Sequence, residues 1–200
     1  MRLRRSGFIL LFGLGALLAA SAHPHVFINN KMTLLFGDGK LKSMTFRWAF
    51  DDMFSEMILT DVKPAKDGTF TPKQTAEIKE GAFDNLKNYH YFLAFFIGKK
   101  PLRNIRIEQF TPSVVEGTKL LYSFFVPLDL PVTTEERTVR VTVYDDTYFV
   151  AFDLMHADDL TVEGDKGISV GLSIEKQKVK PLWPGQYMPD QLVMRYKESE

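Results

Sequence analysis

Residues 26–50 read VFINNKMTLLFGDGKLKSMTFRWAF, and this stretch sets the architecture of the whole chain. The apolar residues of its first half fall on alternate positions, the period of a half-buried β-strand: Val26, Ile28, Met32, Leu34 and Phe36. Gly37-Asp38-Gly39 then supplies a tight turn. The alternation resumes after the turn, at Met44, Phe46, Trp48 and Phe50. The sequence therefore predicts a β-hairpin with one face turned to the core.

The period of the apolar residues changes after this hairpin. Four of them follow the spacing of one helical face: Met53, Met57, Ile58 and Val62. Asp51 or Asp52 is well placed to cap the beginning of that helix. A second helix is expected from Pro72, a residue acceptable in a first turn, towards Tyr89.

Most of the remaining chain has the apolar runs and turn residues of β-strands, at 105–107, 120–126, 139–143, 148–152 and 168–174. We therefore expect a mainly β (α+β) fold: an antiparallel β-sandwich of about seven strands, with an inserted helical hairpin at about 51–90. Residues 23–200 are expected to form this single domain. The tail from Pro181, with Trp183-Pro184-Gly185, is expected to pack as a strap whose last residues are solvated.

The connection between the two helices, residues 63–74, has the outline of a calcium-binding helix-loop-helix. Gly68 stands where the sharp turn is needed, and Phe70 stands at the apolar eighth position. Lys63, Ala65 and Gln74, however, occupy positions that should supply oxygen ligands. One carboxylate, Asp67, is too few for calcium, so we expect a helical hairpin of that shape without calcium.

The first 22 residues have the pattern of a cleavable secretory signal peptide. Three arginines open the segment, Phe8 to Leu18 is a short apolar stretch, and Ala20-Ser21-Ala22 is a small-residue cleavage site. We expect residues 1–22 to be removed and a soluble periplasmic domain to begin at His23. No other stretch has the apolar length of a membrane helix, so the processed protein is not expected to be membrane-embedded.

Charge and cysteine content narrow the classes of function. The chain has 25 basic and 25 acidic residues, and removing residues 1–22 would delete three arginines and no acids. The resulting weakly acidic chain argues against a nucleic-acid partner. The absence of cysteine excludes thiolate zinc sites, iron–sulfur clusters and cysteine nucleophiles. Histidine, carboxylate, methionine and a terminal amine remain as metal ligands.

Two of the four histidines open the expected mature chain, as His23-Pro24-His25. His23 would offer its α-amine and its ring, and His25 would add a second imidazole two residues later. Pro24 has no N–H to deprotonate, which blocks the square-planar amino-terminal copper mode. What remains is similar to the histidine brace of some copper proteins, and nitrogen ligands of this kind suit zinc, nickel and copper alike. The competing interpretation is a poorly ordered polar terminus without function.

Further candidates lie at four other positions. His90, at the end of the second expected helix, is either a metal ligand or a partner of the helix dipole. His156 follows a strand, with carboxylates nearby, and is either a ligand or an exposed loop residue. Asp51 and Asp153 are the acids that a catalytic site would use, although helix capping explains Asp51 more simply. Asp145-Asp146 is typical of a hairpin turn.

Four stretches together resemble one family: Ala22-His23-Pro24-His25-Val26-Phe27-Ile28, Trp48-Ala49-Phe50-Asp51-Asp52-Met53-Phe54-Ser55, Tyr89-His90-Tyr91-Phe92, and Val143-Tyr144-Asp145-Asp146-Thr147-Tyr148. The chain is similar over essentially its whole mature length to the bacterial family called domain of unknown function 1007. That resemblance implies a periplasmic component of an uncharacterised ABC-type transport system. Some members accompany or are fused to nickel/cobalt permeases, so the resemblance also implies a link to metal.

The leading hypothesis is a periplasmic accessory protein that binds zinc, nickel or copper through His23 and His25, with His90 or His156 as additional ligands. Its partner would be a membrane metal transporter or another periplasmic protein. One alternative is a metal-free envelope interaction domain that docks through Tyr89, Tyr91 and Phe92. Another is a copper or zinc metalloenzyme, which requires an open coordination position facing a cleft. We favour a binder over an enzyme.

Overall fold

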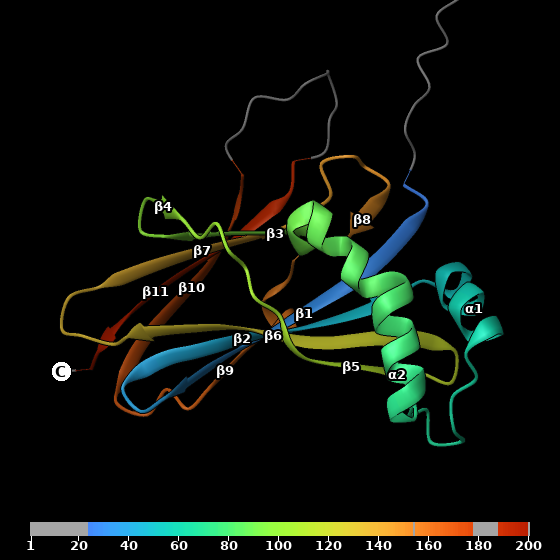
Figure 1. The fold of residues 1–200 in the computed structure, drawn as a ribbon. Helices are drawn as coiled ribbons and strands as arrows, with labels where there is room; N and C mark the ends of the chain where they lie inside the picture. The colour runs from blue at the N-terminus through green and yellow to red at the C-terminus, as the bar shows by residue number, and fades with distance from the viewer. Residues whose placement is uncertain (1–23, 154, 178–187, 200) are drawn as a thin grey trace, which may run out of the picture.

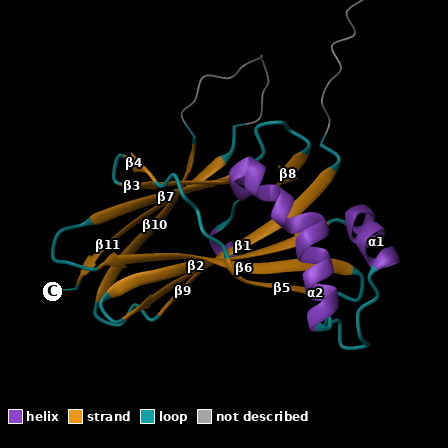
Figure 2. Cartoon of the chain, in the orientation of Figure 1, coloured by secondary structure: helices purple, strands orange, loops and turns teal. Residues whose placement is uncertain are grey.

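The computed structural model describes residues 24–153, 155–177 and 188–199, which form two β-sheets with a helical insertion. Figure 2 shows that strands make up most of the molecule and that the helices lie together on one side. The expected mainly β fold with inserted helices is confirmed. The described residues form eleven strands rather than about seven, and the strand expected at 105–107 begins instead at Glu108.

The first sheet contains the predicted hairpin. β1 (Val26–Gly37) pairs antiparallel with β2 (Lys40–Phe50), and the order continues through β6 (Lys119–Pro131) to β5 (Glu108–Val115). On its other edge β1 pairs in parallel with two short strands, β8 (Val150–Phe152) and β9 (Leu160–Glu163). Alternate residues of β1 are buried, as the sequence pattern predicts.

The second sheet follows the order β10 (Ile168–Lys176), β11 (Asp190–Glu198), β7 (Arg137–Val143), β3 (Leu93–Ile97) and β4 (Lys100–Pro101). Three of its strands, β3, β4 and β11, were not predicted from the sequence. For the tail, the sequence predicts a packed strap with solvated last residues; the segment instead forms β11, in which Leu192 and Met194 are fully buried, and only its end at Glu198 is exposed. The Trp183-Pro184-Gly185 part of that tail lies outside the described residues. β3 follows the helical insertion directly, as an unbroken apolar run that has no strand period.

Aromatic side chains join the inner faces of the two sheets. Phe46 of β2 meets Phe95 of β3 edge to face, with ring centroids 6.1 Å apart, and Phe36 of β1 meets Tyr196 of β11 at 5.3 Å. Trp48 is fully buried, and its indole N–H donates to Asn30 Oδ1 at 3.0 Å. Burial of large rings with their polar atom satisfied is strongly stabilising, so this aromatic layer holds the sandwich without disulfides.

The first helix of the insertion, α1 (Asp52–Asp61), packs beside β6. Its buried side differs from the prediction. Ser55 is fully buried, whereas Met53 and Met57 are 66% and 56% exposed. The two methionines and the pair Phe54 and Ile58 both have helical i, i+4 spacing, so spacing alone did not decide which side faces the protein.

The second helical segment begins at α2 (Pro72–Ile78), where Thr71 and Gln74 form a capping box. It continues as a π-helical turn, η1 (Lys79–Phe83), and then as a 3₁₀-helical segment, η2 (Asp84–Phe92). Its apolar residues Ile78 and Phe83 are buried in the core. In Figure 1 this segment and α1 lie on the same side of the molecule, near β5 and β6.

A short left-handed turn ends this segment. His90, Tyr91 and Phe92 have φ angles of 51°, 53° and 55°, a backbone region that residues with a Cβ atom rarely occupy. The turn leads directly into β3.

The loop between α1 and α2 has a structural role for its glycine. Gly68 has a φ of +80°, and its carbonyl accepts from the backbone N–H of Val114 at 2.8 Å. A Cβ at this position would lie 2.6 Å from the carbonyl oxygen of Val114. Asp67 Oδ1 accepts from the backbone N–H and the hydroxyl of Thr69 at 3.0 and 2.7 Å. The loop is thus shaped by its contact with β5.

Among the described residues, none of the helices combines the length and the apolar character that crossing a membrane requires.

Candidate functional site

The segment that begins β1 is fixed to the sandwich at its first residues. The backbone N–H of His25 donates to the carbonyl of Phe149 at 2.8 Å, and Val26 is buried in the core. The imidazole of His25 is exposed, and its ring centroid lies 5.1 Å from that of Phe149. His25 therefore presents an accessible ring from a held backbone. His23, its predicted partner ligand, lies outside the described residues.

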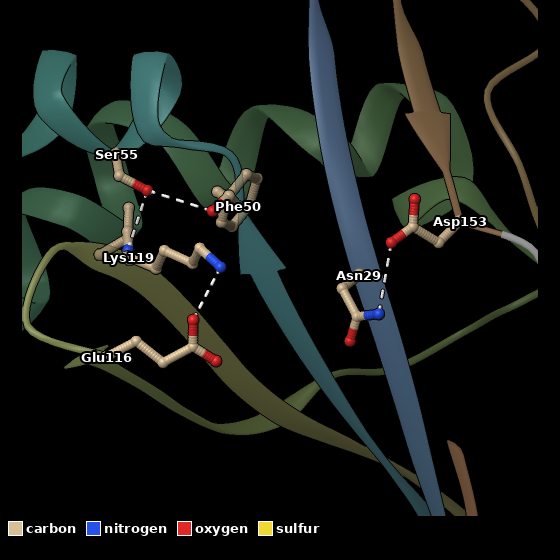
Figure 3. A network of polar contacts seen from close by, with 7 residues as sticks. Asn29, Phe50, Ser55, Glu116, Lys119 and Asp153 are labelled. Carbon is tan, nitrogen blue, oxygen red and sulfur yellow. Dashed lines mark hydrogen bonds and ion pairs between the residues drawn. The ribbon is translucent and has the colours of Figure 1, made fainter. Parts of the chain in front are cut away.

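Polar groups line the outer face of the sheet beyond His25. Strand side chains alternate, so Phe27 and Asn29 share the outward face, and Phe27 is 50% exposed. Asn29 Nδ2 donates to Asp153 Oδ2 at 3.3 Å (Figure 3). Asp153 is the exposed acid nearest to this face along β8. The pair places an amide and a carboxylate at the surface beside β1.

Asp51 holds two elements together with its carboxylate. Oδ1 accepts from the backbone N–H of Phe54 at 2.8 Å and caps α1, as the sequence predicted. Oδ2 accepts from the backbone N–H of Phe27 at 2.6 Å, and the N–H of Asp51 donates to the Phe27 carbonyl at 2.9 Å. Both oxygens are therefore engaged in positioning α1 against the beginning of β1.

Ser55 makes a second link between α1 and the sheet. Its hydroxyl oxygen accepts from the backbone N–H of Leu120 at 2.9 Å and contacts the carbonyl of Phe50 at 3.4 Å, and all of these groups are buried (Figure 3). Sequence spacing had no signal for this contact, because Ser55 and Leu120 are far apart along the chain.

The other two predicted histidine ligands lie elsewhere in the fold. His90 occupies the left-handed turn and faces a hollow lined by Leu93, Phe95 and Arg103. His156 is exposed beyond β8, and its backbone N–H donates to Asp159 Oδ2 at 3.1 Å. Within the described ranges, no three histidine, aspartate or glutamate side chains gather into a group that could hold a metal.

Asp145 lies in a turn, but the turn joins β7 of the second sheet to β8 of the first, so the predicted hairpin is wrong; Asp145 is also buried, with 6% of its surface exposed. Its carboxylate accepts from the backbone N–H and hydroxyl of Thr147 at 2.9 and 2.8 Å and from the backbone N–H of Val150 at 2.9 Å. All of these donors are neutral. Asp146, the next residue, is exposed.

A cavity of about 290 Å³ opens between the beginning of β1, η1, η2 and the segment 145–150. Half of its lining residues are aromatic: Trp48, Phe50, Phe54, Tyr89, Phe92, Tyr122 and Phe149. Asp145 and Thr147 also line it. Sequence analysis missed this cavity, because its walls come from segments that only the fold brings together.

Tyr122 is the most unusual group in that wall. Its side chain is 1% exposed, and its hydroxyl has no hydrogen-bond partner among the described residues. Burial raises the pKa of this phenol well above its ordinary value. The hydroxyl is therefore a neutral, unused donor and acceptor beside an apolar cavity.

Comparison with known proteins gives a family but no activity. A family model described as "Protein of unknown function (DUF1007)" matches residues 8–178. An uncharacterised protein of Haemophilus influenzae is 29% identical over 150 residues, which cover 72% of this chain and 68% of that protein. An uncharacterised 15.5 kDa protein of Spirochaeta aurantia, from the trpE 3′ region, is 29% identical over 61% of this chain and 86% of its own length.

Proposed function

The chain belongs to the DUF1007 family, and from that premise we propose that it is a periplasmic accessory protein that binds a transition-metal ion at the segment beginning with His23. The proposal rests on the position of the His25 backbone and on the exposure of its imidazole. Its backbone is bonded to Phe149 and its imidazole is exposed. A ring held in this way loses little conformational freedom when it coordinates an ion.

The donor set favours zinc, nickel or copper as the bound ion. Imidazole nitrogens suit all three metals, and Pro24 removes the amide nitrogen that a square-planar copper site would use. The α-amine and ring of His23 and the ring of His25 would together provide three nitrogens. An ion held by so few protein ligands keeps open positions, which suits transfer of a cargo to another protein better than permanent storage.

The proposed partner is a membrane metal transporter or another periplasmic protein that accepts the ion. This part of the proposal depends on export and on cleavage after Ala22, because only a terminal His23 has a free α-amine. Mass spectrometry of the exported protein gives the mature N-terminus directly. A mature chain that begins elsewhere would remove the amine ligand and with it the brace.

Metal titration of the exported protein tests the site. Zinc, nickel and copper are each titrated by calorimetry into the wild-type protein and into a His23→Ala/His25→Ala variant. The wild type should bind one equivalent and the variant should lose that binding. His90→Ala and His156→Ala, made singly, report whether either ring contributes. Equal binding by the wild type and the double variant contradicts the proposal.

Protonation provides an independent check on the ligand type. A histidine ligand must be unprotonated to bind a cation, so affinity should weaken as the pH falls below roughly 6.5. Carboxylate ligands would keep their affinity to well below that pH. Titrations at a series of pH values, at constant ionic strength, separate the two.

A metal-free envelope interaction domain is the second candidate, because six large apolar side chains are exposed among the described residues: Phe27, Leu35, Met53, Met57, Tyr89 and Phe149. Apolar surface of this kind marks interaction sites when it is contiguous. A partner captured equally well by the wild type and the His23→Ala/His25→Ala variant, in the presence of a chelator, would favour this candidate over metal handling.

A further inference from the structure

The aromatic cavity beside β1 is a second place where the molecule can bind something, and its wall has a defined charge. Asp145 lines it as a buried carboxylate whose hydrogen bonds come from the neutral groups of Thr147 and Val150. The cavity lining contains no lysine, arginine or histidine. A carboxylate without an opposite charge in the same wall disfavours an anion and attracts a cation.

The aromatic walls point to the same ligand chemistry. Ring faces carry negative potential, and cations bind over them, most strongly where water is excluded. Trp48 is fully buried and Phe92 is 7% exposed, so these two lining rings are largely shielded from bulk solvent. Tyr89 and Phe149, at 51% and 54% exposure, have their rings partly in solvent, as residues at an entrance do.

Backbone strain is found in two segments that form this wall. His90, Tyr91 and Phe92 are left-handed, and Tyr89 and Phe92 at the edges of that turn both line the cavity. Tyr148 also has a positive φ, of 60°, and its neighbours Thr147 and Phe149 line the opposite part of the wall. Strained backbone of residues with a Cβ atom concentrates at ligand-binding sites, where it fixes side chains in place.

From the carboxylate, the aromatic walls and the strained turns together, we propose that this cavity binds a small organic ammonium ion with an apolar body. A volume of about 290 Å³ is roughly ten times the 30 Å³ share of one liquid water. It therefore accommodates a ligand of about ten non-hydrogen atoms.

This inference goes beyond metal binding at His23 and His25, and the two are tested separately. Three probes share one ring and nearly one size: 2-phenylethylamine, 2-phenylethanol and phenylacetate. They are titrated into the exported protein in the presence of a chelator, so that no transition metal takes part. Saturation-transfer NMR detects binding, and calorimetry or tryptophan fluorescence gives the affinity.

The ammonium probe should bind at least about tenfold more tightly than the alcohol, because only the ammonium interacts with Asp145 and the ring faces as a charge. Phenylacetate should not bind. Equal affinities for the amine and the alcohol, or no binding of the amine at millimolar concentration, overturn the proposal. This comparison needs no variant.

Two substitutions locate the bound probe. Asp145→Asn removes the charge and should lower affinity for the amine by at least about tenfold, towards that of the alcohol. Asp146→Asn, at the exposed neighbour, is the matched control and should change nothing. Ala82, which lines the cavity, gives a third variant: Ala82→Leu keeps Asp145 and fills the space. Amine binding that survives Ala82→Leu with full affinity overturns the proposal even if Asp145→Asn does not fold.

Discussion

Replacing Asp51 with alanine is the sharpest test of how this fold is held at the beginning of β1. The change removes both carboxylate oxygens, and therefore the cap on Phe54 and the bond to the backbone N–H of Phe27. Loss of an N-cap costs about 1 kcal/mol, and loss of a hydrogen bond to a charged group costs roughly 1.5 to 3 kcal/mol. Asp51 is only half-buried, so water can replace part of the lost hydrogen bond to the Phe27 N–H and reduce the cost of losing it.

We expect Asp51→Ala to lower the free energy of unfolding by about 2 to 3 kcal/mol, which corresponds to roughly 4 to 12 °C in Tm for a domain of this size. Urea denaturation followed by tryptophan fluorescence measures the free energy, and calorimetry measures Tm. Asp52→Ala is the control. Asp52 is exposed and belongs to the first turn of the same helix, so its loss should cost less than about 0.5 kcal/mol.

Equal stability of Asp51→Ala and wild type would refute the structural role assigned to this carboxylate. It would also reopen Asp51 as a candidate functional acid. Metal titration completes the experiment. If Asp51 only positions α1 and β1, the folded fraction of Asp51→Ala should bind metal with wild-type stoichiometry.

Three further predictions concern other residues of the same framework. Ser55→Ala leaves the buried N–H of Leu120 without its acceptor and should cost about 1 to 3 kcal/mol in urea denaturation, with faster hydrogen exchange at that amide. Gly68→Ala should also destabilise, by more than about 1 kcal/mol, because its φ is positive and its new Cβ meets the Val114 carbonyl. Burial raises the pKa of Tyr196 from 10.0 to about 12, so the phenol of the unfolded chain loses its proton at a lower pH than that of the folded chain. The free energy of unfolding should therefore fall by up to about 3 kcal/mol between pH 10 and 12. Tyr196→Phe should remove this part of the decline, as measured by melting curves at a series of pH values.

The hairpin and the insertion could be predicted from sequence because their signals are local. β1 alternates strictly, β2 alternates except at Ser43, and the helix starts have capping residues at Asp51 and Thr71. β11 could not be predicted, because Leu192, Val193 and Met194 are all buried and give no alternation. β8 and β9 pair in parallel with β1, and parallel pairing leaves no trace in the local sequence.

The candidate site likewise has one part that the local sequence predicts and one part that it does not. His25 could be found from sequence, because it lies next to the first residues of a strongly patterned strand. The cavity could not, because nothing local distinguishes Asp145 from Asp146 in the turn. Only the fold buries the first carboxylate against an aromatic wall and leaves the second in solvent.

The four stretches on which the family resemblance rests lie around one cavity. Each contributes to the wall of the same cavity: Val26 and Ile28 from the first, Trp48, Phe50 and Phe54 from the second, Tyr89 and Phe92 from the third, and Asp145 and Thr147 from the fourth.

Local structural roles account for some residues of these four stretches, since Asp51 caps a helix and Asp145 closes a turn. Such roles do not require the segments to meet. The four segments nevertheless meet around one cavity, and the ring of His25 lies 5.1 Å from that of Phe149 at its edge, so both proposed sites lie at the same end of the sandwich. Metal handling at His25 and ligand binding in the cavity then become separable questions, because chelation removes the first and Ala82→Leu removes the second.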